Sequence, residues 1–395
     1  MKKLMILGGG PNQIPLIRAA KKNGYHVIVC DYNETAPGVA LADELCLVSI
    51  MDKEGVLQAA REKQVDGIIS NSEPAMPIVA YAGNALGVPS NDYETVAAMT
   101  NKYAFRTLLK EKGFAVPDFG MAKTYAEAQM LFARLKKPVM LKPAASSGSR
   151  GVVKISDASQ LKAVFEAAQQ YSRNDLVILE EYIDNACGML VAGDIFISRE
   201  RVVFRGLMDS LRGKAYPLNP LGELYPAALS AEQRTLIENE LNRAAQALHI
   251  VFSAVNIEIV IGPDGKVYFI ELNPRNGGNR IPEALLYATG FDIFDATVRA
   301  AVGETIEPYA EENAGVTATY MVHADTRGTL KAVTFSDALK PFIKDYFPDV
   351  EAGAEVEPFV NSDKRLGVLV MQFDSIPQRD GILSHIKEYV KIELT

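Results

Sequence analysis

Two runs of β-branched and aromatic residues near the middle of the chain carry side chains that could bind a metal ion. Glu258 lies in the first run, Glu271 and Asn273 lie in the second, and a Pro-Asp-Gly turn sequence separates them. This pattern predicts an antiparallel hairpin in which Glu258 lies opposite Glu271, to within one residue of register. Two carboxylates inside an otherwise apolar hairpin are unfavourable unless a cation neutralises them. The oxygen ligands therefore predict a site for Mg²⁺, with Mn²⁺ as the alternative.

The alternative interpretation of this stretch is a surface hairpin whose polar face meets water. Glutamate and asparagine are poor strand formers, and here they interrupt runs of isoleucine, valine and phenylalanine, which favours the metal site. Magnesium commonly completes its coordination with waters and substrate phosphates. Arg275, two residues after Asn273, could place its planar guanidinium on a phosphoryl oxygen.

A second candidate phosphate site follows a strand predicted at 138–142. Lys142 ends this strand, and alanine, serine and glycine residues follow it as far as Gly151. Small residues let backbone N–H groups turn toward phosphate oxygens, serine hydroxyls add donors, and the lysine adds a compact positive charge. A loop of this composition alone could be only a flexible hairpin. The lysine before it and the carboxylates later in the chain make the phosphate interpretation more specific.

A third candidate site is the end of a strand predicted at 176–179. The strand runs into Glu180, Glu181, Tyr182 and Ile183. Backbone groups at such a strand end could bind the edge of an adenine ring while apolar side chains cover its faces. The alternative is an ordinary strand end with solvated glutamates.

The composition limits the kinds of protein that the chain can be. Its 395 residues, 48% hydrophobic and 23% charged, are typical of a globular protein with two or three domains. The net charge of −8, without a basic run, argues against a nucleic-acid partner. The sequence has no apolar run of membrane-spanning length and no signal-peptide pattern, and its three cysteines and four histidines lack metal-ligand spacing. We therefore expect a cytoplasmic protein without a zinc site.

Short strands alternating with helical segments predict a doubly wound parallel sheet over residues 1 to about 95. The first strand ends in three glycines and Asp31 follows the second, as in dinucleotide-binding sheets. Gln13 stands where a third motif glycine would allow close packing of helix and strand. An NAD-binding oxidoreductase is therefore an alternative that is based on an incomplete match. Glu73, after the fourth strand, is either a substrate contact or a feature of a helix N-cap.

Periodicity also predicts the elements that follow this sheet. A helix over 99–112 carries Lys102 near its start. A small β/α unit then has strands at 114–121, 138–142 and 176–179 and helices at 125–135 and 158–171. Residues 316–395 are predicted to form an α+β piece with strands near 318–323, 331–334 and 367–373, and no group of chemically functional residues stands out there.

Taken together, the order and spacing of these motifs resemble those of the ATP-grasp superfamily. The motifs that carry the resemblance are Lys102, Lys142, the loop Ser146–Gly151, Glu180–Ile183, Glu258 and Glu271–Arg275. The resemblance implies a mixed α/β and α+β chain with a doubly wound pre-ATP-grasp domain at 1–98 and an ATP-grasp domain at 99–313. It also implies a lid subdomain at 114–183 and a C-terminal α+β domain at 314–395. Members of similar layout include phosphoribosylglycinamide synthetase, relatives of biotin carboxylase and carbamoyl phosphate synthetase, and amino-acid ligases.

The resemblance also implies roles for individual residues in an ATP- and Mg²⁺-dependent ligase. Lys102 and Lys142 would contact the ATP phosphates, and Arg275 would face the transferred phosphoryl group. The segment Glu180, Glu181, Tyr182 and Ile183, called the hinge below, would bind the cofactor, with backbone groups of Glu181 and Ile183 on adenine. The loop residues Ser146, Ser147, Gly148, Ser149 and Gly151 would close over the phosphates. Glu258, Glu271 and Asn273 would hold the metal ion. Many members bind ribose with a glutamate near the position that Gly188 occupies here, which leaves Asp184 or Asp194 as substitutes.

By the same resemblance, the reaction would join a carboxylate to an amine through an acyl phosphate and release ADP and phosphate. Arg280, Arg212 and Glu73 are candidate contacts for the small-molecule substrates, because arginine pairs with carboxylates and a helix start favours an anion. For Arg280, a solvated surface position is the alternative. A purine-pathway ligase, a bicarbonate-activating ligase and a nucleotide-binding protein without turnover are the further alternatives. A homodimer is expected, because members of the family commonly dimerise.

Overall fold

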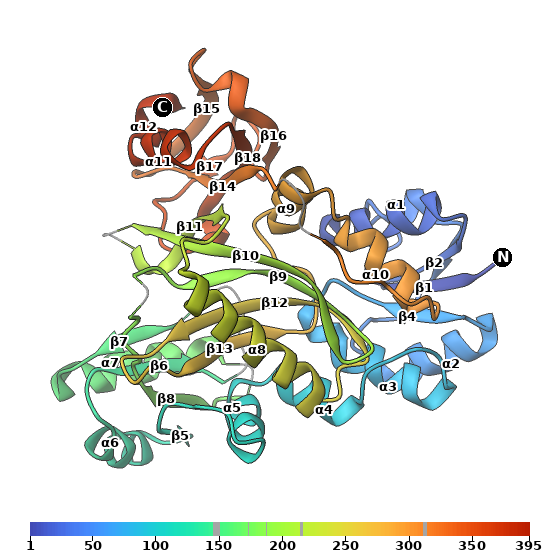
Figure 1. The fold of residues 1–395 in the computed structure, drawn as a ribbon, viewed down its shortest axis with the longest axis horizontal. Helices are drawn as coiled ribbons and strands as arrows, with labels where there is room; N and C mark the ends of the chain where they lie inside the picture. Colours follow the sequence, from blue (N-terminus) through green and yellow to red (C-terminus); the bar gives the residue numbers. More distant parts are fainter. Residues whose placement is uncertain (145–150, 173, 187, 214–215, 311–313) are drawn as a thin grey trace.

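The computed structural model describes residues 1–144, 151–172, 174–186, 188–213, 216–310 and 314–395. Strands near the N-terminus form a parallel sheet in the order β3-β2-β1-β4 (Figure 1). Its strands and accompanying helices are β1 (Lys3–Leu7), α1 (Ile14–Lys22), β2 (His26–Cys30), β3 (Glu44–Cys46), α2 (Lys53–Lys63), β4 (Gly67–Ile69) and α3 (Met76–Leu86). The strands are almost wholly apolar and buried, as expected for a parallel sheet with helices on both faces. The predicted doubly wound sheet is confirmed.

The glycine turn after β1 is completed by side chains of the protein itself. Asp31 accepts the backbone N–H groups of Gly9, at 2.7 Å, and of Asn33, at 2.9 Å. Gln13 is buried, and its side chain packs against Gly8, whose φ of +99° suits glycine. The acid that a dinucleotide-binding sheet would direct at a ribose is therefore engaged by the turn.

A second sheet, in the order β5-β8-β6-β7, forms the small unit at the lower left of Figure 1. Its elements are β5 (Phe119–Ala122), α6 (Tyr125–Arg134), β6 (Val139–Pro143), β7 (Val153–Ile155), α7 (Ala158–Tyr171) and β8 (Val177–Glu181). A capping box between Thr124 and Glu127 starts α6. Phe132 and Phe165, from α6 and α7, belong to the apolar core that covers one face of this sheet.

The boundaries predicted between these two sheets were partly wrong. The helix expected over 99–112 is α5 (Lys102–Glu111), and a break at residues 100 and 101 separates it from α4 (Tyr93–Met99), which was not predicted. The break occurs because the side chain of Asn101 accepts the N–H groups of Tyr103 and Ala104, both at 3.1 Å, and so caps a new helix. The strand expected from residue 114 begins only at Phe119.

The central sheet has the order β13-β12-β9-β10-β11-β14-β18-β16. Its strands are β9 (Val191–Ser198), β10 (Arg201–Gly213), β11 (Tyr216–Tyr225), β12 (Phe252–Ile261), β13 (Val267–Asn273), β14 (Val316–His323), β16 (Ile343–Pro348) and β18 (Arg365–Phe373). Helix α8 (Ala231–Ala247) packs on one face, and α9 (Ile281–Thr289) and α10 (Ile293–Ala301) pack on the other. Because β11 pairs with β14, this sheet continues across the boundary expected at 313.

The C-terminal part adds a smaller sheet in the order β17-β15-β19. Its elements are β15 (Gly328–Phe335), β17 (Glu355–Val356), α11 (Ile376–Ser384), α12 (Ile386–Tyr389) and β19 (Val390–Leu394). His323, at the end of β14, is buried against the rings of Tyr320 and Phe359. None of the helices in the described residues combines the length and apolar character that a membrane crossing requires.

Candidate active site

The hairpin β12–β13 has the register that the sequence predicts. Glu258 pairs with Glu271, and Asn256 pairs with Asn273. Beyond Glu258 the register shifts, so that Ile259 pairs with Phe269 and Ile270 is the extra residue of a β-bulge. Opposite residues of an antiparallel pair point to the same face, so both glutamates lie on one side of the hairpin.

Positively charged side chains lie beside the two carboxylates of the hairpin. Burial raises the pKa of Glu258; Arg212 opposes this effect and Glu271 adds to it. Burial also acts on Glu271, but Lys102 and Arg275 lower the pKa of that carboxyl. Arg212 Nη2 lies 3.5 Å from Glu258 Oε1, and Lys102 Nζ lies 4.0 Å from Glu271 Oε1. Positive side chains thus neutralise a carboxylate pair that would otherwise repel itself.

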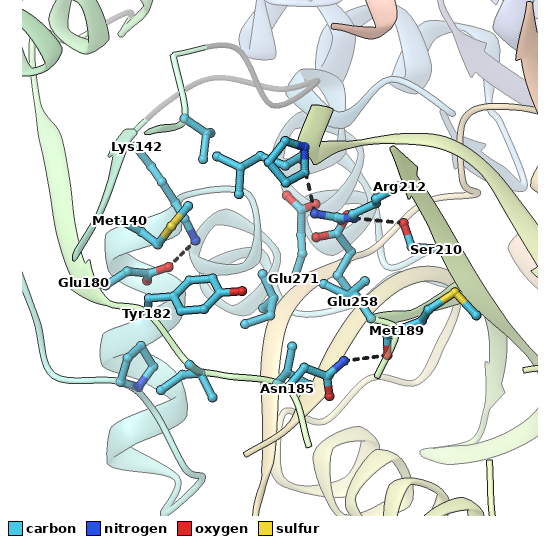
Figure 2. A pocket seen from close by; sticks show the side chains of 18 of the residues that line it. Met140, Lys142, Glu180, Tyr182, Asn185, Met189, Ser210, Arg212, Glu258 and Glu271 are labelled. Atoms are coloured by element: carbon cyan, nitrogen blue, oxygen red, sulfur yellow. Dashed lines mark hydrogen bonds and ion pairs between the residues drawn. The ribbon is translucent and has the colours of Figure 1, made fainter. Parts of the chain in front are cut away.

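The carboxylates face a cavity of about 460 Å³ between the central sheet and the small β5-β8-β6-β7 unit. Figure 2 shows Glu258 and Glu271 on one side, with Lys142, Glu180 and Tyr182 on the side across from them. Of the predicted site residues, those that line the cavity are Glu73, Lys102, Lys142, Glu180, Glu181, Tyr182, Ile183, Arg212, Glu258, Glu271 and Arg275. Motifs that are far apart in the sequence are therefore brought to one space.

Lys142 and Glu180 form a buried ion pair that also includes Arg106. Lys142 Nζ contacts Glu180 Oε1, and Arg106 Nε lies 2.9 Å from Glu180 Oε2. Although burial opposes ionisation, Arg106 and then Lys142 lower the pKa of Glu180 to about 2. Burial lowers the pKa of Lys142, and Glu180 counteracts this effect. The alternative of solvated glutamates is therefore wrong for Glu180, which is 3% exposed.

The remaining hinge residues are fixed largely by their backbone. The N–H of Glu181 donates to the Asp118 carbonyl, at 2.9 Å, and the N–H of Tyr182 donates to the Pro138 carbonyl, at 3.0 Å. The Glu181 carboxylate accepts the N–H of Lys136, at 2.8 Å. These bonds attach the end of β8 to the neighbouring segments and hold it against the cavity.

Arg275 connects the hairpin to the N-terminal sheet. Its Nη2 lies 2.8 Å from Glu73 Oε2, and both side chains are largely buried. Glu73 lies in the first turn of a short 3₁₀ helix, and its preceding residue, Ser72, is the N-cap. The side chain of Glu73 therefore pairs with Arg275 in the cavity wall, and the N-cap position is occupied by Ser72 instead.

The two arginines predicted to contact substrate occupy different environments. Arg212 lines the cavity, where its Nη1 donates to the Leu218 carbonyl at 3.1 Å and its Nε donates to Ser210 Oγ at 3.2 Å. The described residues that line the cavity do not include Arg280. Its Nη1 pairs with Glu283 at 2.8 Å, and its guanidinium lies 3.9 Å from the centre of the Phe347 ring. Arg280 therefore lies outside the described lining of this cavity, and its contact with a substrate stays a prediction.

Other residues predicted to contact the phosphates and the ribose of the nucleotide lie in two segments, the predicted loop before Gly151 and the cavity wall around Gly188. Ser146, Ser147, Gly148 and Ser149 lie outside the described residues, whereas Gly151 follows them with a φ of +70°. The cavity wall where ribose was expected contains Asn185, Gly188 and Met189, and Asn185 Nδ2 donates to the Met189 carbonyl. No side chain of this wall carries a carboxylate among the described residues 185–190.

Asp194 does not replace the missing ribose ligand. It is completely buried and accepts the N–H of Gly277, at 2.8 and 2.9 Å from its two oxygens, and the amide of Asn256 at 2.9 Å. Burial raises the pKa of Asp194 to about 7, against these donors. The side chain therefore supports the loop that follows Arg275.

Other residues of the site were not singled out from the sequence. Arg106, Met140 and Ser210 line the cavity. A signal for Arg106 was present, because it lies four residues after Lys102, and residues four apart share one face of a helix. Met140 and Ser210 had no comparable signal, since methionine and serine are common in strands of many kinds.

Glu223 lies opposite Ser210 on β11 and should make the stability of the folded protein depend on pH. Burial raises its pKa from 4.5 to about 7, although Thr319 donates a hydrogen bond to it. Between these pH values the folded state holds a proton that the unfolded state lacks, so stability falls as the pH rises. We expect Glu223→Gln to remove this loss. In urea titrations, the free energy of unfolding of the variant minus that of the wild type should become about 2–3 kcal/mol more positive between pH 5 and pH 8, because only the wild type loses stability over this range. A difference independent of pH would contradict the assignment.

Two protein-family models match the chain. The model described as carbamoyl-phosphate synthase L chain, ATP binding domain, matches residues 101–309, which is more than half of the chain. The model described as PylC-like, N-terminal domain, matches residues 4–88. The first match covers α5, the small sheet unit and the hairpin β12–β13, and the second covers the parallel sheet.

Individual proteins are similar over most of the chain. An uncharacterized protein of Sinorhizobium fredii, y4rH, is 26% identical over 385 residues, with 95% of this chain and 77% of the relative covered. The carbamoyl phosphate synthase large chain of Pseudothermotoga lettingae is 26% identical over 322 residues, with 77% of this chain covered. That alignment covers only 28% of the relative's own length.

A solved structure shares the fold throughout. The crystal structure of L-amino acid ligase from Bacillus licheniformis superposes with a TM-score of 0.84 and 21% sequence identity. The superposition covers 100% of this chain and 99% of that chain. Both the parallel sheet and the C-terminal part therefore have counterparts in one known architecture.

Proposed function

We propose, from the premise that the chain belongs to the family of carbamoyl-phosphate synthase ATP-binding domains and hence to the ATP-grasp ligases, that it joins a carboxylate to an amine. A carboxylate oxygen attacks the γ-phosphorus of ATP and ADP leaves, which gives an acyl phosphate. The amine then attacks the acyl carbon and phosphate leaves. One observation carries this proposal: Glu258 and Glu271 lie opposite each other and face Lys142 across a single cavity.

The hinge side of the cavity suits the nucleotide. Met140, Tyr182 and Ile183 supply apolar surface for a base, and backbone groups at the end of β8 lie beside them. Such a combination of apolar walls and a few fixed polar groups is typical of cofactor sites. Lys102, which lies 4.0 Å from Glu271, and Lys142, across the cavity from the hairpin, line the same cavity and would bind the phosphates.

The hairpin side suits Mg²⁺, with Mn²⁺ as the alternative. Glu258 and Glu271 supply two carboxylates, and Asn273, which is 1% exposed, lies two residues further along the same face. All three offer oxygen, the donor that both ions prefer. The bound ion would neutralise charge on the phosphates and polarise the phosphorus–oxygen bonds.

The positive residues near the transferred phosphoryl group would reduce the electrostatic repulsion between the two substrates. An anionic carboxylate and the γ-phosphate of ATP repel each other, and Arg275, Lys102 and Lys142 would offset that repulsion. The ion pair of Arg275 with Glu73 limits the directions in which its guanidinium can point. Arg212 lies beside Glu258 and would bind the carboxylate substrate. The small β5-β8-β6-β7 unit would shield the acyl phosphate from water.

A screen for ATP turnover tests this proposal. ADP and phosphate release would be measured with ATP and Mg²⁺ across amino acids, alone and in pairs, and across phosphoribosylamine with glycine and bicarbonate with an amine. We expect release to increase with amino acids, which supply both a carboxylate and an amine. An increase only with phosphoribosylamine and glycine, or only with bicarbonate and an amine, would instead support the purine-pathway or the bicarbonate-activating alternative. If no combination stimulates release, the ligase proposal fails.

We also propose that the chain acts as a cytoplasmic homodimer, as the family resemblance implies. Sedimentation equilibrium at micromolar concentration should give the mass of two chains. A single-chain mass over the whole concentration range would exclude the dimer.

A further inference from the structure

We propose that Arg106 is a positioning residue that holds the nucleotide hinge and the metal hairpin in one arrangement. This inference rests on the proposed function, because it concerns how that site is assembled. Arg106 lies on α5 and is 3% exposed. Arginine at such a position is unusual, since a buried charge is unfavourable unless it is paired and fully hydrogen-bonded.

The guanidinium of Arg106 contacts both sides of the cavity. Its Nε donates to Glu180 Oε2 at 2.9 Å, at the end of hinge strand β8. Its Nη1 and Nη2 donate to the carbonyls of Phe269 and Ile270, each at 3.0 Å, on hairpin strand β13. The planar fork of an arginine thus bridges two strands that belong to different sheets.

The two carbonyls belong to the β-bulge that places Glu271 in the cavity. Ile259 pairs with Phe269, whereas Glu258 pairs with Glu271, so Ile270 has no partner residue on β12. If regular pairing continued from Phe269, Glu258 would oppose Ile270 and Glu271 would oppose Ile257. A shift of one residue turns a side chain to the other face of a sheet. Glu271 would then point into the apolar core that contains Ile257.

A bulge of this kind needs donors from outside the ladder. An extra residue disrupts the local pairing of backbone groups, and buried carbonyls without a partner are unfavourable. Arg106 supplies N–H groups to the bulge residue and to the residue before it. We therefore infer that Arg106 stabilises the bulge and, through it, the pairing of Glu258 with Glu271.

The same arginine leaves Lys142 available to the cavity. Glu180 has two cationic partners, and Arg106 takes one of its oxygens while Lys142 takes the other. Arginine keeps its charge at all ordinary pH values, so Glu180 stays neutralised even when Lys142 turns toward a phosphate. One side chain thereby prepares both the phosphate-binding lysine and the metal-binding carboxylates.

The test measures Mn²⁺ binding in the presence of the non-hydrolysable analogue β,γ-imido-ATP, by the electron paramagnetic resonance of free Mn²⁺. Two variants separate the contacts of Arg106. Glu180→Gln keeps the bonds to the two carbonyls. The double variant Arg106→Gln with Glu180→Gln removes one positive and one negative charge together, so Lys142 loses its carboxylate partner in both variants and only the bonds of Arg106 differ between them. We expect the double variant to bind Mn²⁺ about tenfold or more weakly than Glu180→Gln alone.

Arg379 provides a matched control. It is 2% exposed, pairs with Asp380, and donates to the carbonyls of Tyr225 and Pro226, at 2.9 and 3.3 Å. The described residues that line the cavity do not include it. The double variant Arg379→Gln with Asp380→Asn should leave Mn²⁺ binding unchanged, with thermal unfolding recorded for each variant.

Two results would overturn the inference. The Arg106 double variant could bind Mn²⁺ as tightly as Glu180→Gln alone, or the Arg379 double variant could lose as much affinity as the Arg106 double variant. Arg106→Lys, which keeps a charge but not the fork, should weaken Mn²⁺ binding in the same direction and serves if the double variant does not fold. If the wild type itself binds no Mn²⁺ with the nucleotide, the proposed function fails together with this inference.

Discussion

Replacement of Glu271 by glutamine is expected to lower ADP formation by at least about 10³-fold at saturating substrates while the protein remains folded. Glutamine has the shape of glutamate but lacks the negative charge that holds a divalent cation. The loss follows because Glu258 alone cannot hold an ion that two opposite carboxylates and Asn273 would share. Turnover would be measured by coupled ADP release, and folding by circular dichroism.

The hairpin itself supplies the control for this experiment. Asp264 lies in the exposed turn between the two strands and contacts Tyr268 and Lys266. Asp264→Asn removes one carboxylate from the same hairpin and should leave ADP formation within about twofold of the wild type, since isolated surface ion pairs contribute little. Equal activity of Glu271→Gln and Asp264→Asn would remove the basis for the metal site.

Replacement of Lys142 by methionine is expected to lower ADP formation by about 10²–10³-fold, because a positive charge that stabilises the transferred phosphoryl group is lost. Methionine fills a similar volume, and Arg106 still neutralises the buried Glu180. The variant should therefore fold, and its unfolding temperature should stay close to that of the wild type. Kinetics with varied ATP would show whether the loss lies in binding or in turnover.

Lys162 is the matching control on the same small unit. It lies on α7, is exposed, and its nearest charged partner is Glu166, at 4.0 Å. Lys162→Met changes the net charge by the same amount and should not alter ADP formation. If Lys142→Met retains full activity, Lys142 has no role in phosphate chemistry and its pairing with Glu180 is purely structural.

The sequence predicted local features of the site well. The Pro-Asp-Gly turn and the alternation of the two strands predicted Glu258 opposite Glu271 to within one residue of register, which is confirmed, but they did not predict the β-bulge at Ile270 that makes the two residues direct partners. The parallel sheet and the helices of the small unit were likewise predicted, since their apolar residues repeat with the period of a strand or a helix. Such signals depend only on neighbouring residues.

The features that were missed depend on residues far apart in the sequence. Glu180 was predicted in the nucleotide site, but its burial was not, and that burial is explained by Arg106, which lies 74 residues earlier. Arg280 was predicted to contact a substrate, and its guanidinium lies against the ring of Phe347 in the C-terminal part, which the sequence did not indicate. The continuation of the central sheet from β11 into β14 also had no local signal.

The fold shows what the glycine turn near the N-terminus does in this protein, where the match to a dinucleotide-binding motif is incomplete. Asp31 accepts two backbone N–H groups of its own sheet edge, from Gly9 and Asn33. The contribution of this sheet to the site is instead Glu73, which orients Arg275. Through Glu73, the parallel sheet therefore contributes to the wall of the cavity.

Oxygen-isotope transfer tests the central claim most directly. The carboxylate that most stimulates ADP release would be labelled with ¹⁸O and supplied with ATP, Mg²⁺ and its amine, and the released phosphate would be analysed by ³¹P nuclear magnetic resonance. An acyl phosphate intermediate predicts one ¹⁸O atom in each phosphate, because the carboxylate oxygen that attacks phosphorus leaves with it. Unlabelled phosphate, or formation of AMP and pyrophosphate, would contradict activation of a carboxylate at this site.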